Sequence, residues 1–239
     1  PKRLIKSPKK AKAIFNNAYV NVAPSLYIKE KFEALGYTNI SHIPNSIEIQ
    51  KYKFKQRDFK SINLLWVRSF SKIYNPILAI QVLKSLKDKG IEASLCMVGP
   101  DSDGSLQEAK KVATQNNLAV TFTGKLSKDK WIELSKAYSF FINTTNFDNM
   151  PVSVIEAMAL GMPVISTNVG GIPYLIADKK TGILVSPNQE EEFVNAIKYL
   201  IATPEKALAI AENAREFAQQ LDWLHIKQKW NALLLHIEE

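Results

Sequence analysis

Cysteine is nearly absent from this chain of 239 residues, and its single cysteine, Cys96, cannot form an internal disulfide. Cys96 lies in an apolar run (ASLCMVG) and is expected to be an inert core residue. No apolar run approaches the roughly 20 residues that a membrane-spanning helix needs. The N-terminus is basic and lacks the apolar segment of a signal peptide. We therefore expect a cytoplasmic setting.

Several common site patterns are also missing. The three histidines, His42, His225 and His236, are far apart and share no metal-ligand spacing. The sequence shows no P-loop, no GxGxxG turn and no Ser–His–Asp pattern. The chemistry must therefore be sought in other motifs.

Acidic residues are scarce in the first quarter of the chain. Residues 1–60 carry 13 Lys and Arg against 4 Asp and Glu, a net charge of +9, whereas the remainder carries 18 against 19. One interpretation is a solvated basic face. The other is a peripheral contact with the anionic inner face of a membrane, made through residues 2–12 and 51–60. Nucleic acid is not expected as a partner, because no recognition motif accompanies the charge.

From Ser61 onward, strand-like and helix-like runs alternate. Strands are expected at 62–67, 93–98, 119–122, 138–142, 163–167 and 183–185. Helices are expected at 76–89, 104–115, 128–135, 152–160, 172–177 and 189–202. This alternation predicts an α/β fold with a Rossmann-like, doubly wound parallel sheet. Ligands bind such sheets at the carboxyl ends of the strands.

The opening residues indicate a strand at 19–23, a helix at 25–35 and a strand at 39–43. A single βαβ unit cannot cover both faces of its sheet. We therefore expect the last βαβ segment of an otherwise missing N-terminal domain. The tail reads as two helices that separate near Leu221-Asp222. Four parts result: 1–48, the remnant; 49–60, a linker; 61–203, the main domain; 204–239, the C-terminal helices.

The segment from Asn143 to Pro173, NTTNFDNMPVSVIEAMALGMPVISTNVGGIP, is the most informative. Two carboxylates, Asp148 and Glu156, lie around the expected start of a short helix. Pro151 suits the first turn of that helix. The free N–H groups near Val152 and Ser153 would face an anion.

Two glycine positions complete this segment. Gly161 is expected to end the helix as a left-handed C-cap. The pair Gly170-Gly171 then follows the β-branched strand 164–167. An anion-binding helix start with a glycine turn after the next strand suits a nucleotide-diphosphate ligand.

Over about thirty residues, this segment resembles the donor-binding signature of family 4 of the retaining glycosyltransferases (glycosyl transferases group 1), which have the GT-B fold. That signature has two acidic residues separated by seven others, then EAMA-G-PVI-T--GG-PE. Asp148 stands where the first acid is usually Glu, and Tyr174 stands where an acid commonly follows the last proline. HIPNSIE at 42–48 resembles the turn that leads from the N-terminal domain of these enzymes into the interdomain linker.

The stretch WVRSFSKIYNP resembles the family's Gly-Arg-x(4)-Lys-Gly pattern, whose cations bind the phosphates of the sugar donor. Arg68 and Lys72 would then stabilise the departing diphosphate. Val67 and Ile73 replace the two glycines, and the spacing is one residue shorter. Two solvated loop cations remain the alternative.

The resemblance implies roles for further residues. Glu156, expected on the first turn of its helix, would accept hydrogen bonds from the ribose hydroxyls. Asp148 would contact the transferred sugar and is grouped with Arg68 and Lys72 as catalytic. The remaining candidates for binding the sugar donor are Asn149, Met150, Pro151, Val152, Ser153, Gly99 and Lys125. Of these, Asn149 and Met150 would line the diphosphate side.

Asp101-x-Asp103 superficially matches the metal-binding DxD of a different glycosyltransferase fold. Asp103 is instead expected to be the N-cap of the helix that begins near Gly104. The resembling family needs no bound metal, so we expect no metal and no cofactor.

The resemblance implies a retaining hexosyltransferase that uses a UDP-, GDP- or ADP-sugar. The acceptor would be a saccharide or a lipid-linked molecule, in polysaccharide or lipopolysaccharide synthesis by analogy. This chain would be mainly the donor-binding part and would hardly turn over by itself. A GT-B phosphorylase and a non-catalytic nucleotide-binding module remain alternatives.

Overall fold

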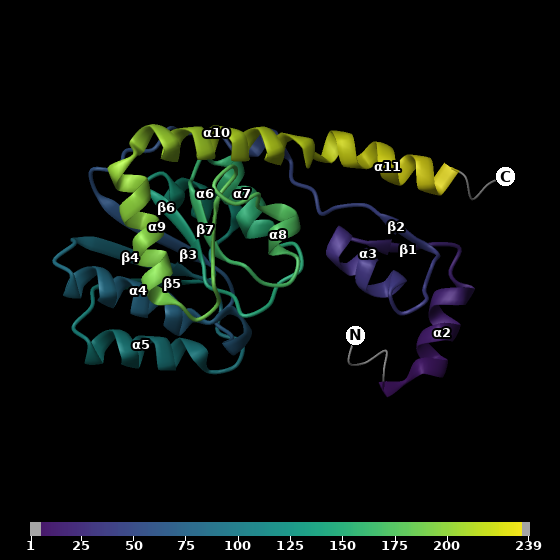
Figure 1. The fold of residues 1–239 in the computed structure, drawn as a ribbon, viewed down its shortest axis with the longest axis horizontal. Coiled ribbons are helices and arrows are strands. Elements are labelled where there is room, and N and C mark those ends of the chain that lie inside the picture. Colours follow the sequence, from purple (N-terminus) through teal and green to yellow (C-terminus); the bar gives the residue numbers. More distant parts are fainter. Residues whose placement is uncertain (1–5, 236–239) are drawn as a thin grey trace.

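The computed structural model describes residues 6–235 (Figure 1). Its main part is a parallel sheet of six strands in the order β5-β4-β3-β6-β7-β8. The strands are β3 Ile62–Val67, β4 Ala93–Val98, β5 Val120–Gly124, β6 Phe140–Asn143, β7 Val164–Thr167 and β8 Ile183–Val185. The predicted α/β fold with a parallel sheet is confirmed.

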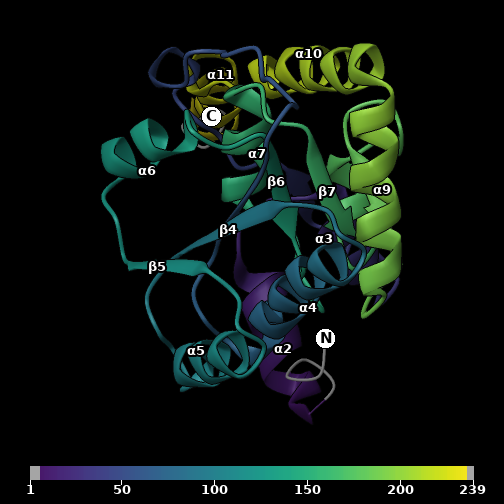
Figure 2. The ribbon, with the colours of Figure 1, turned by 90° about the vertical axis from the view of Figure 1, so that its left-hand side faces the viewer.

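Helices cover both faces of this sheet (Figures 1 and 2). They are α4 Pro76–Asp88, α5 Ser105–Gln115, α6 Lys128–Ser135, α7 Val152–Ala159, α8 Ile172–Leu175 and α9 Glu190–Ala202. Along β3, Leu64 and Trp66 pack in the core beneath α4, α5 and α9, whereas Leu65 packs in the core formed with α7 and α8. Because both faces are buried, the strands are apolar almost throughout.

The N-terminal part contains α2 Pro8–Asn17, β1 Asn21–Ala23, α3 Leu26–Glu33 and β2 Ile40–His42, and it lies to one side of the main sheet (Figure 1). β1 and β2 pair in parallel, as the expected βαβ unit requires. The helix α2 was not predicted. Its sequence is rich in lysine, and Ala11 is its single buried residue, so little packing against the rest of the chain supports it.

Residues 49–60 are more ordered and more buried than a solvated linker. They include the 3₁₀ helix η1 Ile49–Lys51 and the buried side chains of Tyr52, Arg57 and Phe59. The Arg57 guanidinium donates to the carbonyl of Ser135 at 2.6 Å and to that of Leu160 at 2.7 Å. Arg57 therefore cannot take part in the membrane contact expected of residues 51–60.

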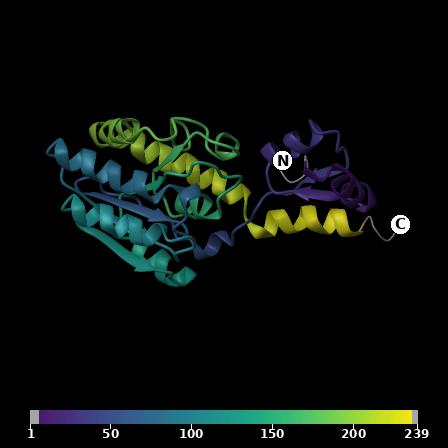
Figure 3. The same ribbon diagram turned by 90° about the horizontal axis from the view of Figure 1, so that it is seen from below.

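The C-terminal helices α10 Pro204–Gln220 and α11 Trp223–Leu235 separate at Leu221-Asp222, as expected. At this break, the Ile47 N–H donates to the carbonyl of Leu221 at 3.0 Å, and the Trp223 N–H donates to the carbonyl of Ile47 at 2.8 Å. The connection out of the N-terminal part is thereby fixed to the helix break. Beyond it, α11 runs alongside the N-terminal part (Figures 1 and 3).

Candidate sugar-donor site

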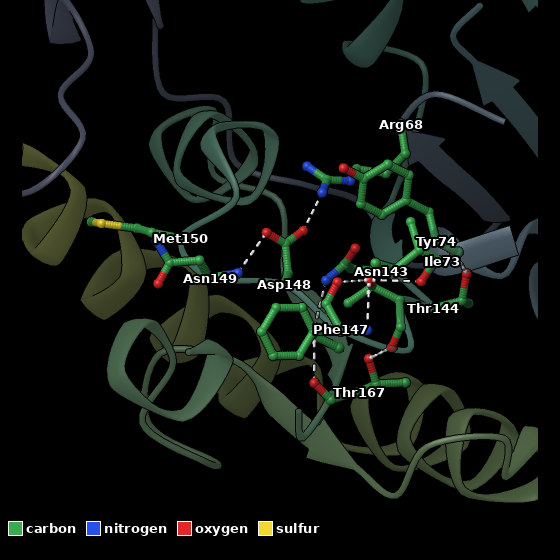
Figure 4. Close-up of polar contacts among 12 residues, drawn as sticks. Arg68, Ile73, Tyr74, Asn143, Thr144, Phe147, Asp148, Asn149, Met150 and Thr167 are labelled. Carbon is green, nitrogen blue, oxygen red and sulfur yellow. Dashed lines mark hydrogen bonds and ion pairs between the residues drawn. The ribbon is translucent and has the colours of Figure 1, made fainter. Parts of the chain in front are cut away.

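Arg68 and Asp148 form an ion pair at the carboxyl end of the sheet (Figure 4). Arg68 follows β3, and Asp148 lies in the loop between β6 and α7. The guanidinium carbon of Arg68 also lies 4.0 Å from the ring centroid of Tyr74. Burial raises the pKa of the Asp148 carboxyl, and the charge of Arg68 opposes that rise. The two predicted residues thus form one largely enclosed charged pair.

The glycine pair packs directly against the loop that carries Asp148. The Gly171 N–H donates to the carbonyl of Asp148 at 2.9 Å. A Cβ atom added at Gly171 would overlap the carbonyl oxygen of Asn149, and one added at Gly170 would overlap that of Asp148. The glycines therefore allow two loops to approach closely enough to position the carboxylate.

Gly99 has a similar role on the other side of Arg68. Its φ is +153°, and a Cβ atom there would overlap the carbonyl oxygen of Arg68. Its N–H donates to the carbonyl of Gly124 at 3.0 Å, while the Arg68 N–H donates to that of Val98 at 3.0 Å. Gly99 thus allows the ends of β3, β4 and β5 to come together.

The helix α7 begins at Val152, so Pro151 occupies the N-cap position and not the first turn. The N–H groups of Val152 and Ser153 make no hydrogen bond to any residue between 6 and 235. The hydroxyl oxygen of Ser153 is buried and has no partner among the same residues. These groups leave the start of α7 able to bind an anion.

The N-terminal part contacts this loop through hydrogen bonds. The Ser25 hydroxyl donates to the side-chain oxygen of Asn149. The Asn45 side-chain amide donates to the carbonyl of Met150 at 2.9 Å. Asn149 and Met150, predicted to line the diphosphate side, therefore lie where the two parts of the chain meet.

Glu156 lies on the second turn of α7 and not on the first, and it is 3% exposed. The Tyr52 hydroxyl donates to its Oε1 atom at 2.7 Å, and Lys128 forms an ion pair with the same oxygen. Burial and the Glu156 carboxylate raise the pKa of Tyr52, so its hydroxyl stays protonated. Neither partner of Glu156 was predicted.

Lys72 and Lys125 lie apart from these pairs. Lys72 is exposed in the 3₁₀ helix η2 Lys72–Tyr74, and its ammonium group has no partner within the described part of the chain. Lys125 is exposed in the loop after β5. Lys128, three positions later, is the lysine that reaches Glu156.

The prediction that Asp103 is the N-cap of the helix α5 is wrong. The helix α5 begins at Ser105 with Gly104 at its N-cap, and Asp101 accepts from the Gly104 N–H at 3.0 Å. Asp103 bonds instead to Ser105 and, through Oδ2, to the Lys72 N–H at 2.9 Å. These hydrogen bonds lower the pKa of Asp103 to about 2. Between residues 6 and 235, no group of three or more His, Cys, Asp or Glu side chains is placed to hold a metal ion.

Tyr174, which stands where the family commonly has an acid, joins the main domain to the N-terminal part. Its hydroxyl donates to the carboxylate of Glu30 on α3. Its ring centroid lies 6.0 Å from that of Tyr27, which in turn lies 6.1 Å from that of Phe147. Tyr174, which replaces the usual acid, therefore extends the contact between the main domain and the N-terminal part.

The parallel sheet, its helices and the βαβ unit beside it have the architecture of GT-B glycosyltransferases. The structure is similar to Anabaena HepE, solved in complex with UDP-glucose, with a TM-score of 0.86 and 22% identity. That similarity covers 97% of this chain and 68% of HepE. Residues 48–217 match the family described as glycosyl transferases group 1, and the chain belongs to this family.

Two curated relatives show how much of such proteins the chain represents. Sulfoquinovosyl transferase SQD2 of Arabidopsis thaliana is 34% identical over 152 residues, which are 61% of this chain and 28% of that protein. Uncharacterized glycosyltransferase MJ1069 of Methanocaldococcus jannaschii is 29% identical over 225 residues, 87% of this chain and 56% of that protein. The chain thus matches little more than a quarter of one relative and just over half of the other.

Among the helices between residues 6 and 235, none combines the length and the apolar character needed to cross a membrane.

Proposed function

We propose that this protein transfers a sugar from a nucleotide-diphosphate sugar to an acceptor with retention of configuration, as in family 4 of the glycosyltransferases. The observation that carries the proposal is the enclosed Arg68–Asp148 pair beside the unbonded N–H groups of Val152 and Ser153. In this arrangement the cation and the helix N–H groups would bind a diphosphate, and the carboxylate would bind a hydroxyl of the attached sugar.

Each group has a distinct part in the proposed reaction. Arg68, together with the exposed ammonium group of Lys72, stabilises the diphosphate as the glycosidic bond loosens. Asp148 accepts hydrogen bonds from the sugar, and Glu156 accepts them from the ribose. The acceptor hydroxyl attacks from the face that the diphosphate leaves. No metal and no cofactor take part, because cations and the helix start neutralise the diphosphate.

The sugar donor carries UDP, GDP or ADP, and the complex of HepE with UDP-glucose supports UDP. The acceptor is a saccharide or a lipid-linked molecule, in polysaccharide or lipopolysaccharide synthesis by analogy. The exposed lysines of α2, Lys9, Lys10 and Lys12, support a peripheral contact with an anionic membrane. The chain spans just over half of MJ1069 and a smaller share of SQD2, so we expect it alone to bind the sugar donor and to release nucleoside diphosphate slowly.

Calorimetric titration with UDP, GDP and ADP tests the proposal. We expect one nucleotide to bind and Glu156→Ala to weaken its binding at least about tenfold, since a lost charge-assisted hydrogen bond costs about 1.4 kcal/mol or more. Glu133→Ala, at an exposed carboxylate on α6, is the matched control and should leave the affinity unchanged. No binding by the folded protein, or equal binding by Glu156→Ala, would contradict the proposal.

Tyr52→Phe tests how Glu156 is held. This change removes the 2.7 Å hydrogen bond to the carboxylate and keeps the ring that packs in the core. We expect nucleotide affinity to fall about five- to tenfold, because the carboxylate loses a fixed orientation. Titration with UDP measures the change, and inorganic pyrophosphate, which has no ribose, should bind both proteins equally. An equal loss for pyrophosphate would show a general structural defect instead.

A further inference from the structure

Lys128 approaches the Glu156 carboxylate from the solvent side. The Lys128 side chain is 50% exposed, whereas that of Glu156 is 3% exposed. Tyr52, the other partner of the same oxygen, is buried at 4% exposure. Of the two partners of this oxygen, Lys128 is therefore the one that a ligand from solvent would meet.

The chemistry of a nucleoside places its base next to this ammonium group, an inference that rests on the proposed function. If the ribose hydroxyls bind Glu156, the base stands on the adjacent ribose carbon. Lys128 is the first residue of α6 and follows the loop from Gly124. Gly124 has a φ of +70°, and a Cβ atom there would meet nothing within 4 Å. No atom of the described residues therefore fills the space directly beside Gly124, at the start of the loop that leads to Lys128.

An ammonium group distinguishes bases by their acceptors, since it has three donors and no acceptor. Uracil presents carbonyl oxygens on both sides of its ring N–H. Adenine has no carbonyl oxygen; its acceptors are ring nitrogens, and its amino group, which is a donor, stands between two of them and opposes an ammonium group there. We propose that Lys128 selects the base of the sugar donor by hydrogen-bonding a carbonyl oxygen, so that the site prefers a uracil nucleotide to an adenine nucleotide.

Lys128→Met tests this role, with UDP, ADP and inorganic pyrophosphate as the calorimetric probes. The unsubstituted protein should bind UDP more tightly than ADP. Lys128→Met should lower the UDP-to-ADP affinity ratio by about tenfold, the size of one charge-assisted hydrogen bond. Pyrophosphate affinity should stay unchanged. Lys130→Met, at an exposed lysine on the same helix, should keep the original ratio.

Two results would overturn the assignment. One is a preference for ADP in the unsubstituted protein. The other is an equal loss of UDP and ADP affinity in Lys128→Met, which would mean that Lys128 acts on the Glu156 carboxylate and does not read the base. Lys128→Gln, which keeps a hydrogen-bond donor, serves as a second variant if Lys128→Met does not fold. Failure of the proposed function is distinct, since the folded protein would then bind no nucleotide.

Discussion

Substitution of Arg68 by methionine is expected to slow the release of nucleoside diphosphate from the sugar donor by at least about a hundredfold at saturating concentration. The guanidinium is held between the Asp148 carboxylate and the Tyr74 ring, so it is oriented before the substrate binds. A preoriented cation in an enclosed site stabilises charge that develops on the departing diphosphate. Its removal should therefore lower kcat much more than it raises KM.

Two further variants separate charge from geometry at this position. Arg68→Lys keeps the positive charge but loses the planar fork, so we expect an intermediate rate. Lys110→Met, at an exposed lysine on α5, should leave the rate unchanged. If Arg68→Met retained a rate within about threefold of the unsubstituted protein, Arg68 would not stabilise the leaving group.

The location of Arg68 and Asp148 at the same edge of the sheet could be predicted from the sequence for a general reason. Both residues follow buried parallel strands, and the carboxyl ends of such strands share one edge of the sheet. β3 and β6 are also direct neighbours, although 80 positions separate the two residues. The glycine pair follows β7, the next strand along. The strand pattern therefore predicted a shared edge of the sheet, whereas the order of the strands and the ion pair itself came from the structure.

The surroundings of Glu156 could not be predicted in the same way. Tyr52 lies in a basic segment that was predicted to be a linker. Its hydroxyl donates a hydrogen bond to Glu156, which is 104 positions later in the sequence. Lys128 is one of several lysines around α6, and no local pattern distinguishes it from Lys125 or Lys130. The Tyr52 contact depends on how the linker packs on the finished domain, and the Lys128 contact depends on which lysine of α6 reaches α7. The prediction that Asp103 is the N-cap of α5 was wrong for a related reason. Its carboxylate accepts hydrogen bonds from the N–H groups of both Lys72 on η2 and Ser105 on α5.

Gly171→Ala should impair the site through the backbone alone. Gly171 has an ordinary negative φ, so alanine adds no conformational strain of its own. The added Cβ would overlap the carbonyl oxygen of Asn149, and this loop is also held by Ser25 and by the Gly171 N–H. The loop must move away, and Asp148 moves with it. A displacement of about 1 Å at such a residue costs about a hundredfold in rate, which nucleoside diphosphate release would measure.

Gly104→Ala is the matched control for this change. Gly104 has a φ of +86°, and a Cβ atom there would meet nothing within 4 Å, so alanine adds backbone strain of about 1 kcal/mol without a clash. We expect Gly104→Ala to lower thermal stability while nucleotide affinity is kept, and Gly171→Ala to lose both affinity and rate. If Gly171→Ala kept its rate while it unfolded at a lower temperature, the glycine pair would support the fold only. The opposite pattern, a lost rate in a protein that is still folded, would mean that the close approach of the two loops positions Asp148 for the sugar donor.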